Sequence, residues 1–161
     1  IEAFEKLSKK YDFISLILVG GDIPSSSLIY KKIHQNERIF YFKNVPLEVI
    51  KEKFYQKAAI FVLPTYAETY GMVIPEAMSY QIPVISTKIQ PITELIVDGH
   101  SGLLIPPGSV HSLIQSLEEL IVDRSLHRRL GYNARQKVIQ TNSFSIVNKK
   151  LYEVYETLIY R

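Results

Sequence analysis

The sequence predicts an α/β fold, in which a parallel sheet carries helices on both faces. Three observations indicate it. Short, wholly apolar runs recur along the chain, and such runs are typical of strands that are covered on both faces. Segments with one apolar face and helical spacing separate these runs. Polar loops with glycine or proline join each run to the following helix. This repeated succession of strand, loop and helix predicts a doubly wound, Rossmann-like sheet.

The first part of the chain is expected to alternate helices and strands. A helix already under way at Ile1 presents Ile1, Phe4 and Leu7 on one face. A buried strand from Ile14 to Val19 follows and ends at a pair of glycines, where a plain turn and a ligand contact are equally compatible with the residues. The next expected elements are a helix over residues 28–35 capped by serine at 25–27, a strand over 38–42, and a helix over 46–57 that a proline begins.

The stretch from residue 58 to 87 organises the chain. It predicts a buried strand over 60–63, a polar loop that holds Glu68 and Gly71, and a helix that opens near Val73 with Pro75 in its first turn. A second buried strand follows at residues 84–86. In open α/β sheets, ligands bind at the carboxyl ends of the strands, where loops lead into helix N-termini that attract anions. We therefore expect a phosphate site in this loop.

The last part of the chain is expected to be mainly helical. A short helix over residues 92–97 and a strand over 103–105 precede helices over 109–122, 125–140 and 145–160. The final helix carries Tyr152, Tyr155 and Tyr160. Packing on their own sheet is the favoured interpretation for these tyrosines, with a contact to another domain as the alternative. No repeat or linker marks a boundary inside the chain.

Composition narrows the classes of function. The chain has 161 residues, with 47% hydrophobic and 22% charged residues, which predicts one globular domain. The net charge of +3 is spread among acidic residues, so no nucleic-acid partner is expected. Cysteine is absent and the four histidines show no ligand spacing, so no metal or other cofactor is expected. No apolar run reaches the roughly 18 residues of a membrane span.

One motif resembles a known family. The run P-T-Y-A-E-T-Y-G-M-V-I-P-E-A-M-S, followed by I-P-V-I-S-T and D-G-H-S-G-L-L-I-P-P-G, resembles the donor-nucleotide domain of retaining GT-B glycosyltransferases of family 4, also called group 1. The family places two Glu with seven residues between them, a Gly three residues after the first, and Glu-Ala-Met-Ser or Glu-Ala-Met-Ala at the second. Glu68, Gly71 and Glu76 match that pattern, and the resemblance continues through nearly all of residues 1–140.

The resemblance implies a role for each matching residue. Glu68 is the catalytic candidate, which orients the donor sugar or steadies positive character at its anomeric carbon; a solvated loop Glu is the alternative. Glu76 can accept hydrogen bonds from both ribose hydroxyls. Backbone N–H groups of Gly71, Met72 and Val73 face the diphosphate and stabilise its departure without a metal. The further candidates for donor contact are Thr69 and Tyr70 in the same loop, Val45 beside the base, and Gly21.

The sequence also departs from the family pattern. Lys43 stands where the loop behind the base usually has a glycine, so the sequence does not decide between UDP and GDP. The family's Arg and Lys ligands of the diphosphate have no match, and one family strand, expected near the sheet centre, has no counterpart. We therefore expect an excised donor domain, truncated at its N-terminus and without the N-terminal acceptor domain. Alone it should bind nucleotide weakly and transfer nothing.

The parent protein is expected to be a cytoplasmic enzyme, with peripheral association at the inner face of the membrane as a further option. Its expected reaction is metal-independent, retaining transfer of a hexosyl group from a nucleotide-sugar to a glycan, lipid or other acceptor. Two alternatives remain from the sequence: a non-catalytic nucleotide- or phosphate-binding module of the same fold, and a related GT-B epimerase or phosphorylase.

Overall fold

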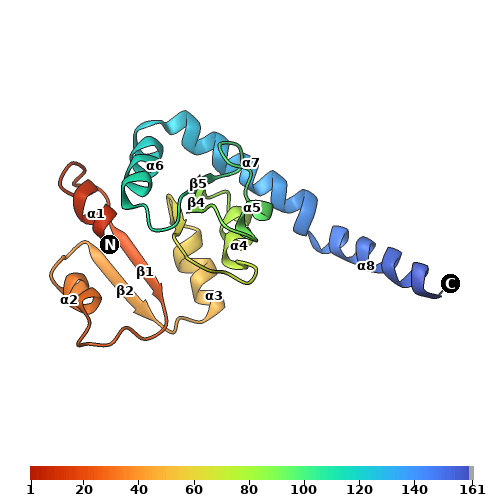
Figure 1. Ribbon diagram of the computed structural model, residues 1–161, viewed down its shortest axis with the longest axis horizontal. Coiled ribbons are helices and arrows are strands. Elements are labelled where there is room, and N and C mark those ends of the chain that lie inside the picture. The colour runs from red at the N-terminus through yellow and green to blue at the C-terminus, as the bar shows by residue number, and fades with distance from the viewer. Residues whose placement is uncertain (160–161) are drawn as a thin grey trace.

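The computed structural model describes residues 1–159 and contains five parallel strands in two sheets (Figure 1). In the first sheet, β1 (Leu16–Gly20) pairs with β2 (Ile39–Lys43), with Leu16 opposite Ile39. The second sheet has the order β3-β4-β5 and consists of β3 (Phe61–Leu63), β4 (Val84–Thr87) and β5 (Leu103–Ile105). The predicted α/β class with parallel strands is therefore confirmed.

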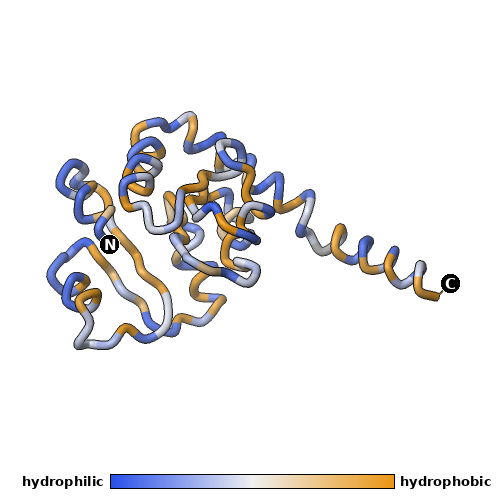
Figure 2. Tube along the Cα trace, viewed as in Figure 1, coloured by the Kyte–Doolittle hydropathy of each residue, from blue (hydrophilic) through white to orange (hydrophobic). Residues whose placement is uncertain are grey.

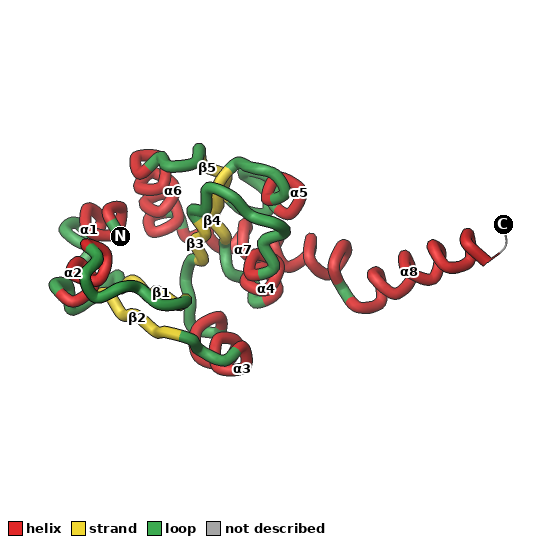
Figure 3. The backbone as a smooth tube through the Cα atoms, turned by 60° about the horizontal axis from the view of Figure 1, so that its bottom comes forward, coloured by secondary structure: helices red, strands yellow, loops and turns green. Residues whose placement is uncertain are grey.

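The strands do not form one continuous sheet. Within residues 1–159, β1 is paired only with β2 and β3 only with β4, so each sheet has an open edge. Figure 3 shows the two sheets as separate groups of strands. The additional family strand that the resemblance placed near the sheet centre has no counterpart among the described residues. The neighbouring strands do not close up to replace it.

Some of the helices begin at a side-chain cap. Ser27 Oγ accepts a hydrogen bond from the Tyr30 N–H at 3.1 Å, and Asp123 Oδ1 accepts from the N–H groups of Ser125 and Leu126 at 2.8 and 2.9 Å. The α-helices other than α3 are α1 (Glu2–Leu7), α2 (Leu28–His34), α4 (Val73–Ser79), α5 (Ile92–Leu95), α6 (Val110–Val122), α7 (Arg124–Asn142) and α8 (Phe144–Ile159).

The segment that was expected to be one helix over residues 46–57 has two parts. The short α-helix α3 (Leu47–Val49) continues as a π-helix, η1 (Ile50–Tyr55). The π-helical turn was not predicted, because the apolar spacing of this segment is compatible with an ordinary helix. Such turns are rare, and they are frequent at functional sites. Tyr55, the last residue of η1, is buried.

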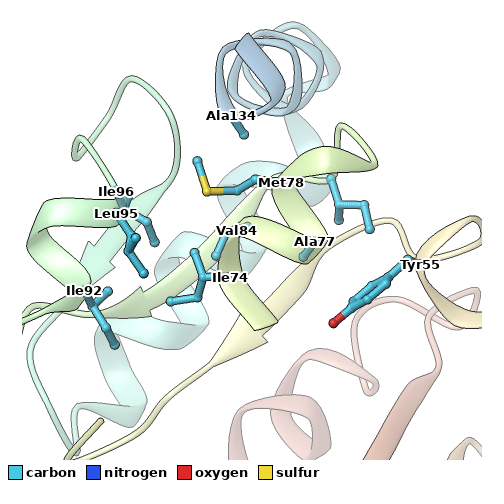
Figure 4. Packing of buried hydrophobic residues seen from close by; sticks show 10 residues of the cluster. Tyr55, Ile74, Ala77, Met78, Val84, Ile92, Leu95, Ile96 and Ala134 are labelled. Carbon is cyan, nitrogen blue, oxygen red and sulfur yellow. The ribbon is translucent and has the colours of Figure 1, made fainter. Parts of the chain in front are cut away.

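The three-stranded sheet has an apolar core on each face. On one face, α4 and α5 pack against the sheet together with Tyr55 and with Ala134 of α7 (Figure 4). On the other face, α6 and the first half of α7 cover the sheet, with Leu120 and Leu130 beside Ile85. The prediction of helices on both faces holds for this sheet, and α6 and α7 pack alongside it.

The two-stranded sheet is covered differently. α1 and α2 pack on one of its faces, where Phe4 and Ile33 contact Ile39. On the other face, Ile17 is 47% exposed and Phe40 is 46% exposed. Phe42 on that face contacts Phe54 of η1, with ring centroids 4.9 Å apart. The expectation that residues 14–19 form a strand buried on both faces is therefore wrong, because this contact with η1 leaves much of the second face exposed.

The last helix leaves the body of the molecule. α8 extends away from both sheets and carries alternating apolar and polar residues (Figures 1 and 2). Tyr152 is 72% exposed and Tyr155 is 54% exposed, so the expectation that they pack on the sheet is wrong. Tyr160 lies outside the described residues. No helix within residues 1–159 combines the length and the apolar character that crossing a membrane requires.

Candidate functional site

The loop between β3 and α4 is held at the carboxyl edge of the three-stranded sheet. Two buried hydroxyls at the end of β4 hold its beginning. Ser86 Oγ donates to the Leu63 carbonyl oxygen and Thr87 Oγ1 donates to the Thr65 carbonyl oxygen, each at 2.7 Å. Parallel strands bring their carboxyl ends to the same edge of a sheet, and ligands of α/β proteins bind there. The predicted loop therefore lies at the predicted edge.

Gly71 turns this loop back toward Glu68. Its φ is +80°, a conformation that residues with a Cβ rarely adopt. A Cβ at this position would lie 3.4 Å from Glu68 Cγ and 3.4 Å from Ile74 Cδ1. The glycine thus permits both the turn and the close approach of Glu68. It also connects the loop that carries Glu68 to the start of α4.

The start of α4 offers unused backbone donors. Met72 is its N-cap residue, and no side chain of the described chain caps the helix. Within residues 1–159, the N–H groups of Gly71, Met72 and Val73 donate no hydrogen bond to the protein. The side chains of Met72 and Val73 are exposed, at 60% and 37%, and do not bury these donors under a packed core. These are the amides that the sequence assigned to a diphosphate.

The two carboxylates of the motif have different surroundings. Glu68 is half-buried, and its Oε1 accepts a hydrogen bond from the Thr69 N–H at 3.0 Å. Glu76 lies in the first turn of α4 and is also half-buried, so it is not turned into the core. Its Oε2 accepts a hydrogen bond from the Tyr55 hydroxyl at 3.1 Å. Glu68 therefore stays within its own loop, whereas Glu76 is tied to η1.

Sequence reasoning missed Tyr55 as a partner of this site. It predicted only a helix over residues 46–57 for this segment, in which Tyr55 is 6% exposed. Burial, followed by the charge of Glu76 and the hydrogen bond to it, raises the pKa of the Tyr55 phenol above its ordinary value of 10.0. The phenol therefore stays protonated and is the donor of the hydrogen bond to Glu76. A buried tyrosine needs a partner for its hydroxyl, and that requirement was the available signal.

The remaining predicted residues are distributed over both sheets. Thr69 and Tyr70 are exposed on the β3–α4 loop, and the Tyr70 hydroxyl accepts a hydrogen bond from Asn142 Nδ2 at 3.1 Å. Gly21 and Val45 follow β1 and β2 in the other sheet. Within the described part of the chain, no hydrogen bond or ion pair joins them to residues 68–76.

The loops that carry Gly21 and Val45 are joined to each other. The Tyr41 hydroxyl donates to the Gly21 carbonyl oxygen, and the Asn44 N–H donates to the Gly20 carbonyl oxygen at 3.0 Å. Lys43, which stands where the family usually has a glycine, forms an ion pair with Asp22. The hydrogen bond to Asp22 raises the pKa of Lys43. The lysine side chain is thus directed to the first loop of its own sheet.

Metal ligands do not cluster in the described part of the molecule. Among residues 1–159, no group of three or more His, Asp or Glu side chains is placed to hold a metal ion.

Comparisons with known proteins agree with the resemblance in the motif. The model of the family "Glycosyl transferases group 1" matches residues 1–137. The capsular polysaccharide biosynthesis glycosyltransferase CapM of Staphylococcus aureus is 28% identical over 162 residues, which cover 99% of this chain and 42% of the relative. The chain thus spans about two fifths of the length of that curated relative.

Solved structures share the fold. The C-terminal domain of the group 1 glycosyltransferase LpcC from Francisella tularensis has a TM-score of 0.79 and 25% identity, covering 89% of this chain and 77% of that one. Anabaena Alr3699/HepE, solved in complex with UDP and glucose, has a TM-score of 0.81 and 21% identity, covering 96% of this chain and 44% of that one. Both therefore share the α/β fold of this chain.

Proposed function

The chain belongs to the group 1 family of glycosyltransferases, and from this premise we propose that it forms the donor site of a retaining hexosyltransferase. The donor is a nucleoside diphosphate sugar with UDP or GDP as its nucleotide. The observation that carries the proposal is the β3–α4 loop, in which Glu68 and Glu76 flank a glycine with φ of +80° at the carboxyl edge of a parallel sheet.

Each part of the donor has a chemically suitable partner in this loop. The Glu76 carboxylate accepts hydrogen bonds from the 2′ and 3′ hydroxyls of the ribose. The N–H groups of Gly71, Met72 and Val73 donate to the diphosphate. This assignment is supported because, within residues 1–159, none of these N–H groups donates a hydrogen bond to the protein. Thr69 and Tyr70 are further contacts in the same loop.

Glu68 acts on the sugar. It orients the hexose or steadies the positive character that develops at the anomeric carbon, while negative charge gathers on the departing diphosphate. Preorganised backbone donors act most strongly on such developing charge, at on the order of a few kcal/mol for each donor. The transfer therefore proceeds without a metal ion. The loop of Val45 backs the base, and Gly21 contacts the ligand from the end of β1.

The whole protein's activity is a further part of the proposal. Its acceptor is a glycan, a lipid or another hydroxyl compound, bound by a part of the protein outside these residues. Similarity to the Staphylococcus glycosyltransferase of capsular polysaccharide biosynthesis supports a role in making polysaccharides, and the Anabaena structure with UDP and glucose supports UDP as the nucleotide. The reaction takes place in the cytoplasm, with the inner face of the membrane as a site of peripheral association.

The test is a titration of the 161-residue chain, followed by NMR so that weak binding is measured. The ligands are UDP, GDP and inorganic pyrophosphate. We expect UDP or GDP to bind more tightly than pyrophosphate, because the ribose adds hydrogen bonds to Glu76. Glu76→Gln should weaken nucleotide binding about tenfold, since hydrogen bonds to a charged group are lost. It should leave pyrophosphate binding unchanged.

The control is Glu153→Gln on α8, an exposed carboxylate in the helix that leaves the body. It should bind all three ligands like the unchanged chain. Equal binding of pyrophosphate and both nucleotides would instead favour a non-catalytic phosphate-binding module. Binding that is insensitive to Glu76→Gln would refute the ribose assignment.

A further inference from the structure

Within the described chain, the hydroxyl of Tyr55 is the one protein group that holds the Glu76 carboxylate. Among the hydrogen bonds and ion pairs of residues 1–159, its 3.1 Å bond to Oε2 alone reaches that side chain. The two residues are separated by 21 positions in the sequence, on η1 and α4. The contact therefore joins two helices that are not consecutive in the chain, since β3 lies between them.

The Tyr55 ring is held rigidly. It is 6% exposed and lies in the core cluster beside α4, near Ala77 (Figure 4). Its centroid is 6.0 Å from that of Phe61 on β3 and 5.5 Å from that of Tyr80 after α4. A ring enclosed in this way cannot move its hydroxyl without disturbing three elements. The donor at Oε2 is therefore fixed in place.

A fixed donor determines how Glu76 presents its carboxylate. An ionised carboxylate has about four acceptor positions on its two oxygens, so one bond from Tyr55 leaves the others for a ligand. A glutamate without a partner would rotate about its side-chain bonds, and binding would cost the entropy of fixing it. We propose that Tyr55 is a positioning residue that orients Glu76 toward the ribose hydroxyls before the donor binds, an inference that rests on the function proposed above.

The test compares two ligands that differ only at the ribose. UDP and 2′,3′-dideoxy-UDP are titrated into the 161-residue chain and into Tyr55→Phe, with GDP and its dideoxy analogue used if GDP is the better ligand. We expect Tyr55→Phe to weaken UDP binding about three- to tenfold, the range of one net hydrogen bond. Binding of the dideoxy analogue should not change. A loss of equal size for both ligands, or for neither, would overturn the inference.

Two further variants separate positioning from general effects. Tyr80→Phe removes a hydroxyl from the same aromatic cluster and should leave both affinities unchanged, because no hydrogen bond in the described chain joins that hydroxyl to Glu76. Adding Tyr55→Phe to Glu76→Gln should weaken UDP binding no further than Glu76→Gln alone, since Tyr55 acts through that carboxylate. An additional loss in the double variant would assign Tyr55 another role.

Failure of this inference differs from failure of the proposed function. If the unchanged chain does not distinguish UDP from the dideoxy analogue, Glu76 does not bind the ribose and both proposals fall. If it does distinguish them, and Glu76→Gln abolishes the difference while Tyr55→Phe keeps it, only the role of Tyr55 is refuted. Thermal unfolding of each variant verifies that the fold is retained.

Discussion

The two sheets of this molecule are built from similar sequences and have very different surroundings. Both contain apolar runs joined by helices in βαβ fashion. In the three-stranded sheet, Val84 and Ile85 are 0% exposed because helices cover both faces. In the two-stranded sheet, Ile17 and Val19 are 47% and 39% exposed because helices cover one face. The same kind of strand is thus a core element in one half and a partly open surface in the other.

The candidate site extends over both halves, so some of its residues have more packed surroundings than others. Glu68, Gly71 and Glu76 lie on the half with two apolar cores, where the surrounding packing fixes the loop. Gly21 and Val45 lie on the half with one apolar cluster. The halves contact each other through α1 and α6. The proposed chemistry needs groups that packing holds in place, so the comparison predicts where substitutions are most harmful.

The largest expected difference is between the same substitution in the two sheets. Ile85→Ala removes a side chain that is 0% exposed in β4, whereas Ile17→Ala removes one that is 47% exposed in β1. Ile85→Ala should lower the free energy of unfolding by about 2–5 kcal/mol, because a cavity remains in a packed core. Ile17→Ala should cost about 1 kcal/mol or less. Urea denaturation of both variants measures this, and equal losses would contradict the comparison.

A smaller effect is expected where helix α7 packs closely on the turn after α4. A Cβ added at Gly131 would lie 2.3 Å from the Gln81 carbonyl oxygen, so the backbone must move. Gly131→Ala should cost about 1–3 kcal/mol in free energy of unfolding. Gly20→Ala, at the end of β1, is the matched control, since no atom lies within 4 Å of its added Cβ. Thermal unfolding should show a loss for Gly131→Ala alone; a similar loss in both would count against the difference in packing.

The smallest effect concerns the link between the halves. Glu118 of α6 forms an ion pair with Lys10 and accepts a hydrogen bond from the Tyr11 hydroxyl at 2.9 Å. The hydrogen bond from Lys10 lowers the pKa of the Glu118 carboxyl below its ordinary value of 4.5. A carboxyl with a lowered pKa in the folded state stabilises the fold above its unfolded value, and this stabilisation is lost as the pH falls through the folded value.

Glu118→Gln should therefore lower stability slightly at pH 7 and have less effect at pH 3, because the stabilisation decreases as the pH falls toward the folded pKa of the unchanged carboxyl. Exposed ion pairs contribute little, so the change should be smaller than that of Gly131→Ala. Chemical denaturation at the two pH values measures it. A destabilisation that is as large at pH 3 as at pH 7 would show that the pair does not act through its charge.

The sequence predicted strands and helices well wherever a local pattern determines them. The strand at residues 103–105 has the predicted bounds, and the helix after Ser27 begins at a predicted serine cap. The helix predicted from residue 109 begins at Val110. It did not predict the exposure of Ile17, because an apolar run indicates a strand and not what covers it. The π-helical turn of η1 was equally invisible, since its apolar spacing is that of an ordinary helix.

The candidate site likewise has features that the sequence predicted and features that it did not. The motif placed Glu68, Gly71 and Glu76 in one loop and helix, and the structure brings Glu68 against Gly71 as a local turn requires. The bond from Tyr55 to Glu76 spans 21 positions and depends on how η1 packs on α4. No local pattern encodes that contact. The separation of the two sheets is likewise a tertiary property, because the spacing within a strand does not determine which strand lies beside it.

An NMR map of backbone amides in the 161-residue chain, as UDP and separately GDP is added, tests whether the β3–α4 loop binds the donor. We expect at least one nucleotide to shift the amide signals of Gly71, Met72 and Val73 the most, with smaller shifts near Val45. If all shifts lie on α8 or on the helices of the two-stranded sheet, or if neither nucleotide causes any, the β3–α4 loop is not the donor site.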